Sequence, residues 1–209
     1  MTPKRRINYD NLGLRVVESY PHTFGYSEEA KLYIAEHPHL IERLRDLAKQ
    51  FLSDETLQEN SDKDIAMNLV ERREGGVEVF KVTIGDDAFC LKVDHKRHQA
   101  VSELKASKKL SELAALEPHI KVVPAFFGYS DREGSDYFFS KWISLPTVEK
   151  LIQDGELLPE EEKYIIELRN MLTEKLGSEF NTGEMHFGNI FWDKDEKIIW
   201  LFDQSWRYA

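Results

Sequence analysis

The stretch "NTGEMHFGNIFWD", Asn181 to Asp193, and the run "KIIWLFD", Lys197 to Asp203, decide the fold of the carboxyl-terminal part of this chain. The turn sequence "KDE" separates their two apolar runs, a pattern that predicts a β-hairpin. In such a hairpin Asn189, which begins the first run, lies beside Asp203, which ends the second. Amide and carboxylate oxygens are ligands that magnesium prefers, so this pair predicts a metal site. Glu184 lies in the same loop, where its carboxylate can face a substrate hydroxyl.

The composition sets bounds on the class of protein. The 209 residues are 41% hydrophobic and 11% aromatic, which suits one domain with a small appended element. A net charge of -10 argues against general nucleic-acid binding, which requires a basic surface. We expect no membrane span and no secretory signal, because no apolar stretch is long enough for the first and the N-terminus lacks the apolar run of the second. Cys90 is the single cysteine, so we expect no intrachain disulfide and a reducing, cytoplasmic compartment.

Residues 1–60 are expected to form an N-terminal helical extension. Residues 27–52 are predicted to be helical, with Ser27 as the capping residue and Pro38 dividing the segment into two helices. The polar residues 53–64 are predicted to be a linker.

The next part of the chain has the pattern of a sheet. Apolar and polar residues alternate from Met67 to Asp94, with interruptions at Gly75-Gly76 and Gly85-Asp86-Asp87. This predicts three antiparallel strands joined by two tight turns. A helical stretch follows, then the strand "YFFSKWI", and then a helix that begins at Pro159. The order of elements therefore predicts an α+β protein.

A lysine and a glutamate in this region form a candidate ion pair. Lys92 lies at the end of the third predicted strand, on the same face as Cys90, and Glu103 follows eleven residues later in the predicted helix. A Lys–Glu pair would hold the ammonium in place for phosphate binding. An exposed helix glutamate is the structural alternative for Glu103, and Glu112 is a possible substitute for it.

These pieces resemble the protein-kinase-like superfamily, especially aminoglycoside phosphotransferases and the compact kinase effectors of bacteria. "TGEMHFGN", Thr182 to Asn189, resembles the H-G-D-x-H-x-x-N stretch of those phosphotransferases. "KIIWLFD" resembles the strand that leads into the magnesium-binding aspartate, and "FCLKVD" resembles the strand that carries the phosphate lysine. The resemblance covers roughly residues 65 to 206.

The resemblance implies a bilobal kinase-like fold with ATP and Mg²⁺ as cofactors. It implies an N-lobe with an antiparallel sheet over residues 61–141 and a truncated C-lobe over residues 142–209. The implied catalytic residues are Glu184, Lys92, Asn189 and Asp203, with Asn189 and Asp203 as metal ligands. The implied nucleotide-binding residues are Lys92, Glu103, Gly75 and Gly76 of the glycine loop, and Ser140, Lys141, Trp142 and Ile143 near the adenine.

The sequence departs from the family pattern at several positions. Glu184 stands where the family has a catalytic aspartate, and Thr182 stands where it has a histidine. Gln204 and Ser205 follow Asp203, where protein kinases have Phe-Gly. Because six residues follow Asp203, we expect a truncated C-lobe.

Three interpretations of function follow. The first is an ATP/Mg-dependent phosphotransferase that acts on a hydroxyl of a protein or a small molecule, with a protein acceptor slightly favoured. The second is a pseudokinase-type binding module that binds nucleotide with little or no catalysis. The third is an unrelated α+β domain whose matches are accidental. The expected compartment is the cytoplasm, or a host cytosol if the protein is delivered as an effector.

Overall fold

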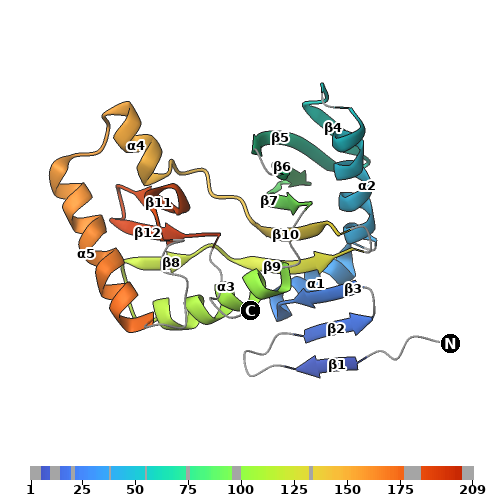
Figure 1. Ribbon diagram of the computed structural model, residues 1–209, viewed down its shortest axis with the longest axis horizontal. Coiled ribbons are helices and arrows are strands. Elements are labelled where there is room, and N and C mark those ends of the chain that lie inside the picture. Colours follow the sequence, from blue (N-terminus) through green and yellow to red (C-terminus); the bar gives the residue numbers. More distant parts are fainter. Residues whose placement is uncertain are drawn as a thin grey trace. The chain divides into compact units, whose positions relative to one another are not determined.

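The computed structural model, shown in Figure 1, has two compact units. Unit 1 comprises Met1–Leu104 and Ala125–Trp142, and unit 2 comprises Lys105–Pro124 and Ile143–Ala209. The residues that the structure describes are 6–9, 15–19, 22–37, 39–54, 56–73, 76–95, 100–131, 134–176 and 185–203.

Unit 1 is built on an antiparallel sheet, in which the described residues form nine strands in the order β1-β2-β3-β9-β10-β7-β6-β5-β4. The strands are β1 (Arg6–Tyr9), β2 (Arg15–Ser19), β3 (His22–Tyr26), β4 (Glu59–Asp62), β5 (Ile65–Arg73), β6 (Val77–Ile84), β7 (Asp87–Asp94), β9 (Ala125–Ser130) and β10 (Asp136–Lys141). This sheet, together with the helices of both units, confirms the expected α+β class.

The three predicted antiparallel strands are present as β5, β6 and β7. Gly76 and Gly85 lie in the two turns between them and have φ of 91° and 59°, a region that glycine enters without steric cost. Strand β6 alternates between partly exposed and buried residues along its whole length. Its buried side chains include Phe80 and Val82, which face the core. The period of two in the sequence therefore corresponds to the two faces of β6.

Helices α1 (Glu28–Glu36) and α2 (Leu40–Ser53) cover one face of this sheet (Figure 1). The Ser27 side chain accepts a hydrogen bond from the backbone N–H of Ala30 at 3.2 Å, as expected of the capping residue. Phe51 of α2 is fully buried and packs against Phe80, with ring centroids 4.9 Å apart. The apolar stripe of α2 is Leu40, Leu44, Leu47, Ala48 and Phe51.

Two parts of the N-terminal region differ from the expectation. Residues 1–60 contain the two expected helices, but they also contain β1, β2 and β3, which were not predicted. β3 pairs with β9, about a hundred residues away in sequence, so a distant partner defines this strand. The prediction of a linker over residues 53–64 was wrong in part, because β4 pairs with β5 there. Its sequence "ENSD" is polar, and an edge strand needs no apolar alternation.

Unit 2 combines helices with a small sheet. Helix α3 (Ala100–Ala114) begins in unit 1 and continues into unit 2, which also contains α4 (Val148–Asp154) and α5 (Pro159–Leu176). The predicted hairpin is confirmed as β11 (Ile190–Asp193) and β12 (Ile198–Leu201). Strand β8 (Ile120–Val122) extends it by pairing in parallel with β12.

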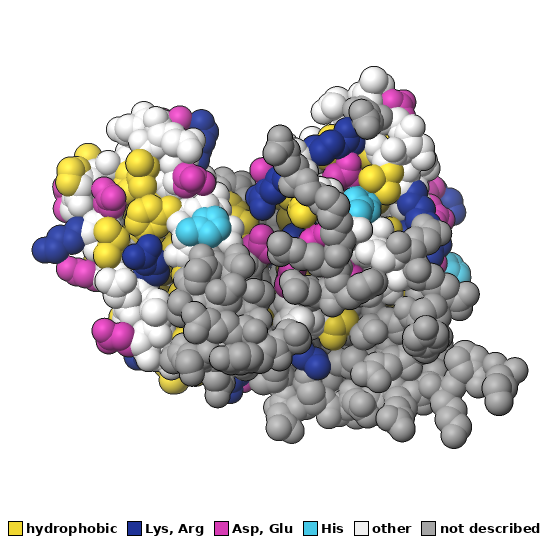
Figure 2. Space-filling view, viewed as in Figure 1, with side chains coloured by type: hydrophobic (Ala, Val, Ile, Leu, Met, Phe, Trp, Pro, Cys, Tyr) yellow, Lys and Arg dark blue, Asp and Glu magenta, His cyan; other side chains and the backbone are white. Residues whose placement is uncertain are grey.

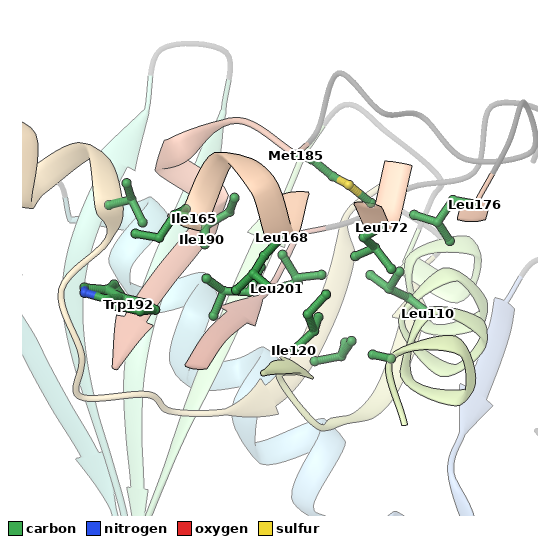
Figure 3. Close-up of a cluster of buried hydrophobic side chains, with 14 of the residues drawn as sticks. Leu110, Ile120, Ile165, Leu168, Leu172, Leu176, Met185, Ile190, Trp192 and Leu201 are labelled. Carbon is green, nitrogen blue, oxygen red and sulfur yellow. The ribbon is translucent and has the colours of Figure 1, made fainter. Parts of the chain in front are cut away.

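The core of unit 2 lies between the hairpin and the helices (Figure 3). Leu168 of α5 lies beside Leu201 of β12 and Ile190 of β11, and Leu172 of α5 lies beside Leu110 of α3. Trp192 is 3% exposed, and its ring lies 6.2 Å from that of Tyr164 on α5. This buried apolar layer holds the hairpin in place, and with it the residues at both of its ends.

Candidate functional site

In unit 1, Lys92 and Glu103 form an ion pair. Lys92 Nζ lies 3.0 Å from Glu103 Oε1, and the two side chains are only 16% and 12% exposed. The lysine comes from β7 and the glutamate from the first turn of α3. Pairing and partial burial restrict the movement of both side chains. An exposed pair would be held more weakly, because water screens the attraction between its charges. The structural alternative of an exposed glutamate is therefore wrong.

The position of Glu103 depends on how α3 begins. The backbone N–H of Ala100 donates to Asp136 Oδ2 at 3.0 Å, which satisfies one of the orphan N–H groups at a helix start. The helix also lies directly on β9 at Gly128, where an added Cβ would be 2.3 Å from the Ala100 carbonyl oxygen. Gly128 thus permits an approach that any side chain would block. Gly128 and Asp136 position Glu103, and the sequence analysis did not single out either residue.

The glycine turn between β5 and β6 is tied to the end of β7. Gly76 donates its N–H to the Arg73 carbonyl at 3.3 Å, and its own carbonyl accepts from the N–H of His95 at 3.1 Å. Below the turn, Glu78 is 3% exposed and accepts from Arg72 Nε at 2.8 Å. His95 Nε2 lies 3.6 Å from the other oxygen of Glu78. A buried charge is costly unless it is paired, and Arg72 provides the partner of Glu78.

The end of β10 and the two residues after it are the four residues predicted to lie near the base. Ser140 is buried and Lys141 is exposed. The backbone N–H of Trp142 donates to the Ala88 carbonyl at 3.1 Å, which attaches this residue to β7. Ile143 begins the second segment of unit 2.

In unit 2, Asn189 and Asp203 are brought together by the hairpin. Asn189 is 3% exposed, its carbonyl accepts from the N–H of Phe202 at 3.2 Å, and its Nδ2 lies 3.5 Å from the Asp203 carbonyl oxygen. Asp203 has a φ of 55°, in the left-handed region that aspartate tolerates better than most residues. Strained backbone of this kind is frequent at functional sites.

The loop before Asn189 is held by its own side chains. His186 Nδ1 accepts from the Gly188 N–H at 3.1 Å at the start of the short helix η3 (Phe187–Asn189). A Cβ at Gly188 would be 2.8 Å from Glu149 Oε2 of α4 and 2.9 Å from His186 Cε1. His186 therefore orients this loop through a backbone contact.

Asn189 and Asp203 are the two residues of unit 2 that the sequence predicted as metal ligands. Across the described ranges, no three His, Cys, Asp or Glu side chains cluster so that they could hold a metal ion. Magnesium usually binds through one or two protein oxygens and completes its shell with water and substrate phosphates. Asn189 and Asp203 would supply such a partial shell, and ATP would supply the phosphate oxygens.

The structure brings the predicted residues together in two sets. Lys92, Glu103, Gly76 and the residues from Ser140 to Trp142 belong to unit 1, and Ile143, Asn189 and Asp203 belong to unit 2. Gly75 and Glu184 lie outside the described residues. The described face in Figure 2 carries acidic and basic side chains in mixture, without an extended basic patch. None of the described helices has the length and apolarity that crossing a bilayer requires.

Comparison with known proteins finds similarity in structure and none in sequence. No family model matches the chain, and no curated protein matches its sequence. Among solved structures, the chain is similar to the kinase PK-1 of Cydia pomonella granulovirus, with 13% sequence identity and a TM-score of 0.45. The match covers 78% of this chain and 55% of that one, so this chain spans just over half the length of that kinase.

Proposed function

We propose that this protein is a Mg·ATP-dependent phosphotransferase that transfers the γ-phosphate to a hydroxyl group. The observation that carries the proposal is the Lys92–Glu103 ion pair at 3.0 Å. Lys92 lies on the third strand of the β5-β6-β7 meander, after the glycine turn, and Glu103 lies on the helix that follows. Kinases hold the ATP phosphates with a lysine and a glutamate at these same two positions.

Each proposed residue has a separate role in the reaction. Lys92 binds the phosphates, and Glu103 keeps its ammonium in place. Asn189 and Asp203 hold magnesium, which neutralises the charge that develops on the transferred group. Glu184 orients the acceptor hydroxyl.

The remaining proposed residues enclose the nucleotide. Gly75 and Gly76 cover the phosphates with backbone, because a glycine turn allows close approach. Ser140, Lys141, Trp142 and Ile143 contact the adenine.

Nucleotide binding is the first test. At a hundredfold excess of Mg·ATP over its Kd, a bound ligand stabilises the native state by about 2.7 kcal/mol. For a chain of this size that corresponds to a rise in Tm of roughly 5 to 11 °C. Lys92→Ala should abolish the rise, whereas Lys163→Ala on α5 should preserve it, because the side chain of Lys163 is 79% exposed and pairs with Glu167 of the same helix. A wild-type protein that is folded and shows no rise with Mg·ATP contradicts the proposal.

Phosphoryl transfer is the second test. The protein is incubated with γ-labelled ATP and a cell lysate, beside Asp203→Ala and Lys163→Ala. We expect label in an acceptor with the wild type and the Lys163 variant, and none with the Asp203 variant. Label that does not depend on Asp203 rejects the enzymatic assignment. A parallel reaction with α-labelled ATP distinguishes nucleotidyl transfer from phosphoryl transfer.

A pseudokinase-type binding module is the second candidate function, favoured by Glu184 at the position of the catalytic aspartate. A misplacement of about 1 Å can cost roughly a hundredfold in rate, and the longer side chain risks such a shift. This candidate predicts nucleotide binding that depends on Lys92 without any Asp203-dependent transfer. If Glu184→Asp gains phosphoryl transfer, the glutamate at this position is the cause of the missing activity.

For the acceptor, we propose a hydroxyl of a protein in the cytoplasm, or in a host cytosol after delivery. The net charge of -10 supports a partner with a basic surface, because complementary charge accelerates association. The lysate experiment tests this directly. Label in small molecules alone, after removal of macromolecules by filtration, excludes a protein acceptor.

A further inference from the structure

Two lysines project from the same face of the sheet in unit 1. In β6, Val79 and Lys81 lie on the face opposite to the buried side chains that pack under α2, and in β7 the same holds for Cys90 and Lys92. The register pairs Val79 with Lys92 and Lys81 with Cys90. Lys81 and Lys92 are therefore diagonal neighbours, about 7 to 8 Å apart at their side-chain bases. The face on which Lys92 would bind phosphates thus carries a second ammonium group.

The two lysines have different partners. Lys92 is paired with Glu103. Lys81 forms no ion pair with any carboxylate of the described residues, and its Nζ lies 5.5 Å from the centre of the Trp142 ring. A cation over an aromatic face is attracted by the ring without losing its charge. Lys81 therefore adds a positive charge to this face, and no carboxylate of the described residues pairs with it.

The Trp142 ring, which Lys81 contacts, lies at one end of this face of the sheet. Trp142 follows β10 directly, and its backbone N–H is bonded to Ala88 of β7 at 3.1 Å. This bond and the contact with Lys81 hold the residue from two sides. Because the proposed function assigns Trp142 to the nucleotide base, the ammonium of Lys81 lies at the base and not at the phosphates.

We infer that Lys81 determines which purine is bound and favours guanine over adenine, an inference that rests on the proposed nucleotide-binding function. An ammonium offers three N–H donors and no acceptor. Guanine presents two acceptors side by side, O6 and N7, whereas adenine presents an amino donor in place of O6. A donor-only side chain stabilises the first pattern and is repelled by the second. Lys81 thus recognises a 6-oxopurine nucleotide.

The test compares the affinity of the full-length protein for Mg·GTP and Mg·ATP by calorimetry. We expect the wild type to bind Mg·GTP at least as tightly as Mg·ATP. Lys81→Met, which keeps the apolar stem, should lower the ratio Kd(ATP)/Kd(GTP) by about tenfold, near the low end of the discrimination that one good base contact provides. Lys81→Arg should retain the wild-type ratio, because its guanidinium also donates to O6 and N7 and stacks on the ring.

The chain offers a matched control. Lys121 Nζ of β8 lies 5.0 Å from the centre of the Trp200 ring, and this contact of the same type belongs to unit 2. Lys121→Met should leave the ratio unchanged. If Lys81→Met does not fold, Lys81→Gln gives the same comparison, since it also removes the charge.

Two results overturn the inference in distinguishable ways. A folded wild type that binds neither nucleotide rejects the proposed function and this inference together. Nucleotide binding with the same ratio in the wild type and the uncharged Lys81 variants, or a wild type that prefers Mg·ATP by more than tenfold, rejects only the role of Lys81.

Discussion

A methyl group added at Gly128 should displace the helix that carries Glu103. An ideal Cβ at this position lies 2.3 Å from the carbonyl oxygen of Ala100, 2.5 Å from its carbonyl carbon and 3.0 Å from the backbone nitrogen of Val101. All three atoms belong to backbone, so no side-chain rotation relieves the clash. Since ordinary contact begins near 3.4 Å, the start of α3 and β9 must separate by 3.4 − 2.3 = 1.1 Å along that line.

This displacement has a cost in stability and in binding. Overpacking of a close contact costs about 1 to 3 kcal/mol, which lowers Tm by roughly 2 to 12 °C for a chain of this size. The movement also acts on Glu103, one turn into α3, so the 3.0 Å contact with Lys92 should lengthen. We therefore expect Gly128→Ala to remain folded at 25 °C and to bind Mg·ATP at least tenfold more weakly, a fraction of the roughly hundredfold effect that a 1 Å misplacement can have.

The assay is thermal unfolding together with nucleotide titration, and Gly85→Ala is the matched control. Gly85 has a φ of 59° and no atom within 4 Å of an added Cβ, so alanine there introduces backbone strain without a clash. The control should lose some stability and keep its affinity for Mg·ATP. If Gly128→Ala has the Tm and the affinity of the wild type, the argument that this glycine positions α3 is wrong.

Three further predictions concern other parts of the chain. The hydrogen bond from Arg43 lowers the pKa of Asp64 in the folded protein below its usual 3.8. The contact therefore stabilises the folded state fully above pH 3.8, and this stabilisation is lost as the pH falls through the lower pKa of the folded state. The urea concentration at the midpoint of unfolding should therefore fall more steeply from pH 6 to pH 2 in the wild type than in Arg43→Gln. Equal slopes in the two proteins would contradict this contribution of the Arg43–Asp64 contact. Gly188→Ala should lower Tm less than Gly128→Ala, because the nearest neighbours of the added Cβ are the flexible ends of side chains. Adding Glu149→Ala to Gly188→Ala should restore part of the lost Tm. Calorimetric scans of the single and double variants test both expectations. Leu172→Ala should cost about 2 to 5 kcal/mol of unfolding free energy in urea titrations, since the side chain is fully buried, and a cost below 1 kcal/mol would contradict the assigned core.

The candidate site was partly accessible from sequence. Alternation along β7 predicted the face of Lys92, and the helical spacing after it made Glu103 the candidate partner. The ion pair between them is present, and its role in binding phosphates stays a prediction. No local pattern singles out Gly128 or Asp136, because each acts through a contact with α3 at the position of Ala100, which lies 28 residues before one and 36 before the other.

By itself, the sequence determined the local elements: the meander β5-β6-β7, the divided helices α1 and α2, and the hairpin that joins Asn189 to Asp203. Each of these follows from the period of apolar residues and from turn or cap residues within about ten positions. The tertiary structure alone decided the strand pairs β3-β9 and β8-β12, the edge strand β4, and the position of Lys81 over Trp142. The physical reason is that backbone hydrogen bonds between distant strands carry no side-chain signature, and a contact between two side chains depends on where the whole chain brings their backbones.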